Sequence, residues 1–312
     1  MMQLYEDRET FEQLVILTSQ YTAIPEAIIE KDYYVSLLLN ELSQCIPDLI
    51  FKGGTSLSKA YRLIDRFSED IDLSIFNADH HLPAQRDLKY IHQTIMDVVN
   101  KVGLVIQNPE HIRSRGRVNR YEIIYDHIHI TDTLKDHVLI ETYFVHAPYP
   151  CEKTTISNYI YDYIQQDNML HLADQFTELV PFDMKVQSLH RTFIDKLFAI
   201  CDKYEARTPD KFSRHLYDLY HIWDIIQTDQ HELLALFSLV QSDLSKDIER
   251  NPSSATDYPF QQRLIEILDT NFFENDYNRL TMQLFVHNSV PYDQIVTFLR
   301  KVFKQLQFNA RY

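Results

Sequence analysis

Two adjacent glycines, Gly53 and Gly54, constrain this chain more than any other feature of its sequence. Only four of the 312 residues are glycine, so a pair of them marks a place where the backbone must do something that a side chain would prevent. The pair follows a short apolar run, residues 49–51, that predicts a strand, and it precedes a predicted helix over residues 55–66. Backbone N–H groups in such a turn, together with the N-terminus of the helix, favour an anion such as phosphate. Two hydroxyl groups at the start of the helix would add hydrogen bonds: Thr55 and Ser56.

Downstream of this turn, residues 70–76 alternate between polar and apolar side chains, which predicts a strand. The alternation puts Asp70 and Asp72 on one face, about 7 Å apart, where both can ligate the same divalent ions. Mg²⁺ prefers oxygen ligands and shares its coordination shell with substrate phosphates, so it suits this pair. A third acid, Glu141, lies in a strongly apolar predicted strand, where a carboxylate is costly unless a cation compensates it. It is either a third metal ligand or a simple edge-strand glutamate.

The predicted helix 55–66 also carries an apolar stripe opposite three basic residues, Lys59, Arg62 and Arg66. These residues form either a solvated basic face or a set of cations beside a phosphate.

The periodicity along the chain predicts an α/β (α+β) protein with two parts. Residues 1–150 should form a small mixed sheet with flanking helices, and residues 151–312 a helical C-terminal domain. Beyond the elements already described, helices are predicted over most of residues 1–45 and over 85–102, and strands over 121–130 and 138–145. Past about residue 155 the pattern is helical, with helices predicted over 156–164, 191–204, 212–226, 231–244, 261–268 and 292–306.

Two residues of the C-terminal part are candidates for a functional role. Lys196 falls off the apolar stripe of its predicted helix, so it projects either into a cleft or into water. Asp218 follows Arg214 at the i,i+4 spacing, for which a surface ion pair is the simplest interpretation.

Charge limits the partners that the chain can bind. Thirty Lys and Arg residues against forty-five Asp and Glu residues give a net charge of −15, so the overall field repels nucleic acid. Any RNA contact therefore needs a local basic patch, and one stretch around Gly116 is densely basic. This stretch is either a solvated hairpin tip or a contact for an RNA backbone or an acidic partner. Its arginines are Arg113, Arg115, Arg117 and Arg120.

Several other classes of protein do not fit the sequence. No window approaches about 18 uncharged apolar residues, so we expect no membrane span. The first residues lack the features of a signal peptide, and the three widely spaced cysteines suggest no disulfide framework, so we expect a cytoplasmic protein. No His/Cys spacing typical of zinc, no nucleophile elbow and no Walker-type loop is present.

Four blocks of this sequence together resemble the AbiEii/AbiGii toxin family, a branch of the DNA polymerase β-type nucleotidyltransferase superfamily. The most specific block runs Phe51-Lys52-Gly53-Gly54-Thr55-Ser56-Leu57-Ser58-Lys59 and continues with Arg66-Phe67-Ser68-Glu69-Asp70-Ile71-Asp72-Leu73. The others are Ile29-Glu30-Lys31-Asp32-Tyr33-Tyr34, Arg191-Thr192-Phe193-Ile194-Asp195-Lys196-Leu197 and Arg214-His215-Leu216-Tyr217-Asp218-Leu219-Tyr220. Two departures from the family pattern are the fifteen residues between Gly54 and Asp70, and Asp195 where the family commonly has glutamate.

The resemblance implies a nucleotidyltransferase that moves a nucleoside monophosphate from a nucleoside triphosphate to an acceptor hydroxyl, such as one on tRNA, and releases pyrophosphate. It also implies the toxin of a bacterial toxin–antitoxin or abortive-infection system, with a cognate antitoxin. We expect two Mg²⁺ ions at Asp70 and Asp72, with Glu141 as a third ligand or as the base toward the acceptor. Asp218 would hold Lys196 or contact the nucleotide. The triphosphate would be held by Gly53, Gly54, Thr55 and Ser56 and neutralised by Lys59, Arg66 and Lys196.

Two other functions remain open from the sequence. The chain could be a toxin that binds a nucleotide without turnover and acts by association with a partner. It could also be a small-molecule nucleotidyltransferase of the antibiotic-modifying kind.

Overall fold

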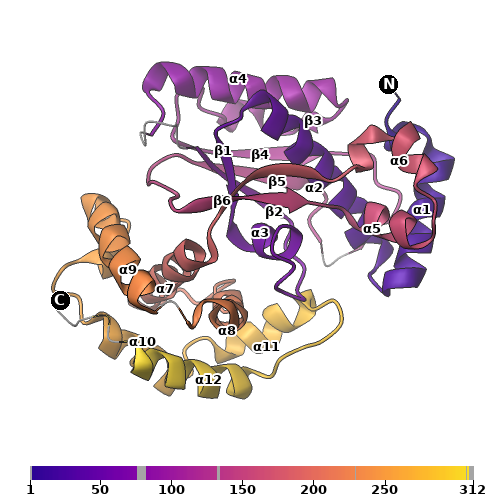
Figure 1. Ribbon diagram of the computed structural model, residues 1–312. Helices are drawn as coiled ribbons and strands as arrows, with labels where there is room; N and C mark the ends of the chain where they lie inside the picture. The colour runs from indigo at the N-terminus through magenta and orange to yellow at the C-terminus, as the bar shows by residue number, and fades with distance from the viewer. Residues whose placement is uncertain (1, 76–81, 132–133, 229, 307, 309–312) are drawn as a thin grey trace. The chain divides into compact units, whose positions relative to one another are not determined.

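A computed structural model describes residues 2–75, 82–131, 134–228, 230–306 and 308, and it groups the chain into two compact units. Unit 1 comprises Met1–Arg62 and Arg66–Gln187, and unit 2 comprises Leu63–Asp65 and Ser188–Tyr312. Unit 1 holds a sheet with helices, and the described part of unit 2 is helical (Figure 1). This arrangement confirms the predicted α/β fold class. The expected domain boundary at residue 150 falls inside unit 1, because two strands beyond it complete the sheet.

The described residues of unit 1 form a seven-stranded mixed sheet with the order β3-β4-β5-β2-β1-β7-β6. At its centre, β2 is parallel to β5 and antiparallel to β1, and β1 is parallel to β7. The outer strands β3, β4 and β6 pair in antiparallel fashion. The strand bounds are β1 Leu49–Lys52, β2 Asp70–Ile75, β3 Val105–Ile106, β4 Val118–Ile124, β5 Val138–Tyr143, β6 Cys151–Ile156 and β7 Phe182–Gln187.

Helices pack around this sheet through apolar faces. The long helix α4 contacts α2 and lies along the strands in Figure 1, while α1 packs on both α2 and α5. Helix α3 follows β1 directly and contacts both β1 and β2, so it lies beside the strand that carries the aspartates. The helix bounds are α1 Arg8–Thr22, α2 Glu26–Cys45, α3 Gly53–Lys59, α4 Gln85–Lys101, α5 Tyr159–Gln166 and α6 His171–Gln175.

Two local predictions for unit 1 are wrong. The helix expected over residues 55–66 ends at Lys59, and Arg62 then adopts a left-handed backbone with φ of 50°. The pattern past residue 155 is not uniformly helical, because β7 lies there and pairs in antiparallel fashion with β6, with α5 and α6 between the two strands in the sequence. These two strands join the sheet through the parallel pairing of β7 with β1, a long-range contact that short sequence windows do not contain.

Unit 2 is built around α7, which packs on α8, α9 and α10, while α12 packs on α8 and α10. The segment Leu63–Asp65 belongs to this unit, where the Asp65 carboxylate accepts the backbone N–H of Asn288 at 2.9 Å. The helix bounds are α7 Leu189–Glu205, α8 Arg214–Ile226, α9 Gln230–Leu244, α10 Phe260–Asp269, α11 Glu274–Arg279 and α12 Tyr292–Gln305. None of the helices in the described residues has both the length and the apolar character needed to cross a membrane.

Candidate active site

Three carboxylates share one face of the central sheet of unit 1. Asp70 and Asp72 are two residues apart on β2, and Asp72 pairs in register with Glu141 on the parallel strand β5. Because side chains alternate along a strand and match across a register pair, all three point to the same side. β5 pairs with β4 on one side and β2 on the other, so Glu141 is not on an edge strand.

Asp70 and Glu141 each contact a basic side chain of the same unit. Lys135 Nζ lies 2.6 Å from Asp70 Oδ1, and Arg120 Nε lies 2.5 Å from Glu141 Oε1. Arg120 is the register partner of Glu141 in the β4–β5 pair, so the two side chains are neighbours on the same face. The compensating cation that the sequence requires near Glu141 is therefore Arg120.

The glycine pair lies directly against this acidic face. Gly53 has a left-handed φ of 77°, and a Cβ atom on it would overlap the carboxylate of Asp72. A Cβ atom on Gly54 would lie 2.8 Å from Ser68 Oγ and 2.9 Å from Arg66 Nη2. Because neither glycine has a side chain, Gly53 leaves space for the Asp72 carboxylate and Gly54 for the Arg66 guanidinium.

The hydroxyl groups that open α3 hydrogen-bond to nearby backbone. Thr55 Oγ1 donates to the Asp70 carbonyl at 2.5 Å, and Ser56 Oγ donates to the Gly53 carbonyl at 2.9 Å. Both residues are buried. Their hydrogen bonds tie the start of α3 to β2 and stabilise the turn itself.

The three basic residues that the sequence places on one face of a helix have separate environments. Lys59 is buried and forms an ion pair with Asp32 of α2, whose other oxygen accepts the backbone N–H of Tyr159 at 3.0 Å. Burial raises the pKa of Asp32, and the neighbouring Lys59 ammonium opposes that rise. Arg62 is exposed and pairs with Asp162 at 3.0 Å. Arg66 is buried, and together with Asp32 and Lys59 it lines a small cavity.

Helix α2 supplies contacts that the sequence reasoning missed. Glu30, Lys31 and Asp32 are consecutive and buried. Glu30 accepts the backbone N–H groups of Ile128 and His129 at 2.8 Å each, and Lys31 Nζ lies 2.5 Å from Glu69 Oε2. The available signal was the position of the run, because apolar residues flank it on both sides in a helix that is buried over most of its length.

Unit 2 contains a buried ion pair between two of the predicted residues. Lys196 Nζ of α7 lies 2.7 Å from Asp218 Oδ2 of α8, and these side chains are 6% and 0% exposed. Neither is a surface charge, and the contact is one that a role of Asp218 in holding Lys196 would need. His215 Nδ1 lies 3.3 Å from Lys196 Nζ, and burial together with that ammonium lowers the pKa of His215 to about 3. His215 is therefore neutral at physiological pH.

The four arginines of the basic stretch fall into two groups. Arg113 and Arg115 are exposed in the segment before β4. Arg117 donates from Nη1 to the Phe144 carbonyl at 2.9 Å, and Arg120 pairs with Glu141. Arg120 is also exposed, but its Nε contacts Glu141, so Arg113 and Arg115 are better placed to meet an external anion.

A metal would have to be held by carboxylate oxygens. Within the described ranges, no group of three or more His, Cys, Asp or Glu side chains is arranged to hold a metal ion. Asp70 and Asp72 nevertheless have the chemistry that Mg²⁺ prefers, since both present carboxylates on one sheet face. Carboxylate oxygens suit a divalent cation as ligands. In this structure Asp70 and Glu141 contact the basic side chains of Lys135 and Arg120.

Comparison with known proteins finds a matching family and matching solved structures. The family described as the nucleotidyl transferase AbiEii toxin of a type IV toxin–antitoxin system matches residues 37–297. A solved structure, the nucleotidyltransferase toxin MenT4 of Mycobacterium tuberculosis, superposes with a TM-score of 0.61 and 19% sequence identity, covering 94% of this chain and 89% of that one. At this identity the structural likeness concerns the fold. No curated protein sequence matches the chain.

Proposed function

This chain belongs to the AbiEii family of nucleotidyltransferase toxins of type IV toxin–antitoxin systems, and from that premise we propose that Asp70 and Asp72 form the centre of its active site. Family membership implies a nucleoside triphosphate substrate and an antitoxin partner. The reaction that we propose transfers a nucleoside monophosphate to an acceptor hydroxyl and releases pyrophosphate. The cytoplasm, where triphosphates and RNA are available, is the expected compartment.

One observation supports the proposal most strongly. Asp72 lies against Gly53 and in register with Glu141, so strand pairing and a missing side chain together define where its carboxylate sits. A solvated acidic strand would not need a left-handed glycine against one of its carboxylates. This arrangement favours a site in which the position of Asp72 matters.

Asp70 and Asp72 would hold divalent metal, for which we propose two Mg²⁺ ions, with Glu141 as a third ligand or as the base toward the acceptor. When bound, such ions stabilise the negative charge that develops on the transferred phosphoryl group. The protein's own contribution is positioning. Thr55 fixes the start of β2 through its hydrogen bond to the Asp70 carbonyl, and the missing side chain of Gly53 leaves space for the Asp72 carboxylate.

The triphosphate would meet the glycine turn, Gly53 and Gly54 with Thr55 and Ser56, and the Arg66 guanidinium that lies against Gly54. A guanidinium suits this role because it offers planar, paired donors to phosphate oxygens. Lys59 has a buried carboxylate as partner, so we propose that it contributes by anchoring α3 to α2. In unit 2, we propose that Lys196 neutralises phosphate oxygens and that Asp218 orients it.

For the acceptor we propose an RNA, with tRNA as the first candidate. Arg113 and Arg115, which are exposed, are the support for this choice, because an acidic chain needs local positive charge to bind a phosphate backbone. Arg117 and Arg120 would contribute by shaping the segment that carries them.

The test incubates the purified protein with Mg²⁺, each α-labelled nucleoside triphosphate in turn, and total bacterial RNA. We expect label in an RNA band, and we expect Asp72→Asn to lower its rate of appearance by about a hundredfold or more. Asp183→Asn is a matched control, because Asp183 is an exposed acid on β7 of the same sheet. Thermal unfolding of both variants verifies that they fold.

The outcomes separate the parts of the proposal. Label in RNA with wild type and Asp183→Asn, but not with Asp72→Asn, supports an RNA nucleotidyltransferase and identifies its nucleotide. Label in protein or in a small molecule would overturn the RNA acceptor alone. Full activity of Asp72→Asn would overturn the site.

A further inference from the structure

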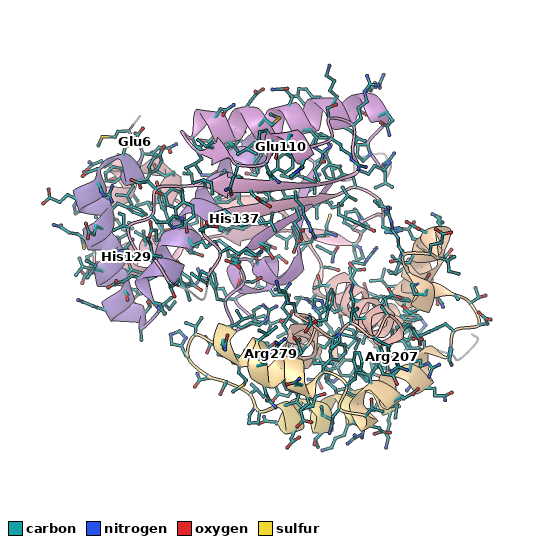
Figure 2. The ribbon with its side chains drawn as sticks, turned by 180° about the vertical axis from the view of Figure 1, so that it is seen from behind. Glu6, Glu110, His129, His137, Arg207 and Arg279 are labelled. Carbon is teal, nitrogen blue, oxygen red and sulfur yellow. The ribbon has the colours of Figure 1, made fainter. Side chains whose placement is uncertain are left out.

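Lys135 forms an ion pair with Asp70, one of the two aspartates proposed to bind metal. It lies on the connection between β4 and β5, which also carries His129 and His137, both labelled in Figure 2. Its Nζ is 2.6 Å from Asp70 Oδ1 and 3.9 Å from Glu69 Oε1, and its side chain is 33% exposed. The ammonium therefore occupies one oxygen of Asp70 while still bordering solvent.

The backbone of Lys135 is held on both sides by a buried ion pair. Its N–H donates to Glu69 Oε2 at 3.2 Å, and its carbonyl accepts from Lys31 Nζ at 2.8 Å. Lys31 is fully buried and bonds to that same oxygen of Glu69. Because both contacts are made to the peptide groups of residue 135, they fix where its side chain begins.

A second contact of α2 restrains the same connection. The Glu30 carboxylate accepts the backbone N–H groups of Ile128 and His129. Glu30 and Lys31, which are adjacent on α2, therefore both hold the segment that places Lys135 beside Asp70. This degree of support exceeds what a surface ion pair needs, since such pairs contribute little to stability.

We propose that Lys135 is the built-in counter-ion of Asp70 and competes with divalent metal for its carboxylate. Glu69 and Lys31 are the positioning residues that keep the ammonium there. The inference rests on the proposed function, in which Asp70 binds metal. The Lys135 ammonium occupies Asp70 Oδ1 and repels a divalent cation placed beside the same carboxylate, so metal binding at Asp70 is weaker while Lys135 stays there.

This competition makes a measurable prediction for metal affinity. Replacing Lys135 by Met keeps most of the side-chain volume and removes the charge, so Asp70 becomes available. Mn²⁺ is titrated in the absence of nucleotide, and free ion is followed by electron paramagnetic resonance. We expect Lys135→Met to tighten Mn²⁺ binding by about fivefold, the factor that corresponds to the interaction free energy of a partly exposed ion pair.

Two further variants are controls for charge and for the site. Lys135→Arg keeps a cation at Asp70 and should leave Mn²⁺ affinity within about twofold of wild type. Lys153→Met removes an exposed lysine that pairs with Asp183 elsewhere in the sheet, and should leave the affinity unchanged. Asp70→Asn should abolish the gain when it is combined with Lys135→Met.

Unchanged or weaker Mn²⁺ binding by Lys135→Met would overturn the inference, and so would equal tightening by Lys153→Met. Failure of the proposed function is separate, because it is read from nucleotide transfer by wild-type protein. Transfer by the wild type together with unaltered Mn²⁺ affinity in Lys135→Met would leave the function standing and remove the counter-ion role.

Discussion

Gly53 and Asp72 illustrate, at the scale of single residues, how a local conformation serves a distant side chain. Gly53 follows β1 and has a left-handed backbone. Because it has no side chain, there is space beside it for a carboxylate oxygen of Asp72, nineteen positions further along the chain. A glycine is required there for two reasons, the sign of φ and the space beside Cα. These reasons can be separated by substitution.

We predict that Gly53→Ala abolishes nucleotide transfer and also lowers the free energy of unfolding. A left-handed backbone costs an L-residue about 1–2 kcal/mol, and the new methyl group would displace the Asp72 carboxylate. The measurements are urea unfolding and the labelling assay. Gly103→Ala is the control, since Gly103 also has a positive φ, 69°, but faces the flexible end of Tyr5. It should share the stability loss and keep the activity; retained transfer by Gly53→Ala would contradict the prediction.

Helix α2 shows, at the scale of an element, how one helix organises several segments. Glu30 holds the connection between β4 and β5, Lys31 holds Glu69, and Asp32 holds Lys59 of α3. Each contact is buried, so each charge depends on its partner for compensation.

We predict that Asp32→Ala destabilises the protein by about 3–5 kcal/mol, because it leaves the Lys59 ammonium buried without its carboxylate. The double variant Asp32→Leu with Lys59→Met should recover most of the loss, since no charge then stays buried. Urea unfolding measures both. Asp183→Ala is the comparison, because its pair with Lys153 is exposed and should be worth less than about 1 kcal/mol. A loss for Asp32→Ala no larger than for Asp183→Ala would show that Lys59 finds other compensation.

Net charge governs binding at the scale of the whole molecule. A chain with a net charge of −15 repels RNA at long range, so affinity must come from a few local contacts and must fall steeply with salt. Three arginines of the dense basic stretch are exposed, and of these Arg120 pairs with Glu141 while Arg113 and Arg115 lie in the segment before β4.

We predict that reversing both, Arg113→Glu with Arg115→Glu, weakens RNA binding by at least about tenfold and reduces the salt slope of log K by about 1.4 to 1.8. Nucleotide binding should be unaffected. Arg86→Glu with Lys89→Glu makes the same change in net charge at exposed positions of α4 and is the matched control. Equal weakening by both double variants would mean that overall charge, and not this segment, controls binding.

Much of the fold and part of the candidate site could be predicted because they depend on local pattern. The strand, glycine pair, helix and Asp70–Asp72 alternation lie within 25 residues, and α7 and α8 have clear apolar stripes. The strands β6 and β7 were missed, because β7 is stabilised by pairing with the distant strand β1 and β6 by pairing with β7, and neither pairing is indicated by the local residues.

The sequence by itself determined that a glycine pair precedes two acids on one strand face, because neighbouring residues set strand and helix periodicity. Only the tertiary structure decided which cation meets which carboxylate: Lys135 with Asp70 across 65 positions, Arg120 with Glu141 across 21, and Lys59 with Asp32 across 27. Strand register and burial decide these partners. A charge that is removed from water must be compensated by a group that the fold places beside it. Those properties arise when separate segments pack together, so no single stretch of sequence contains them.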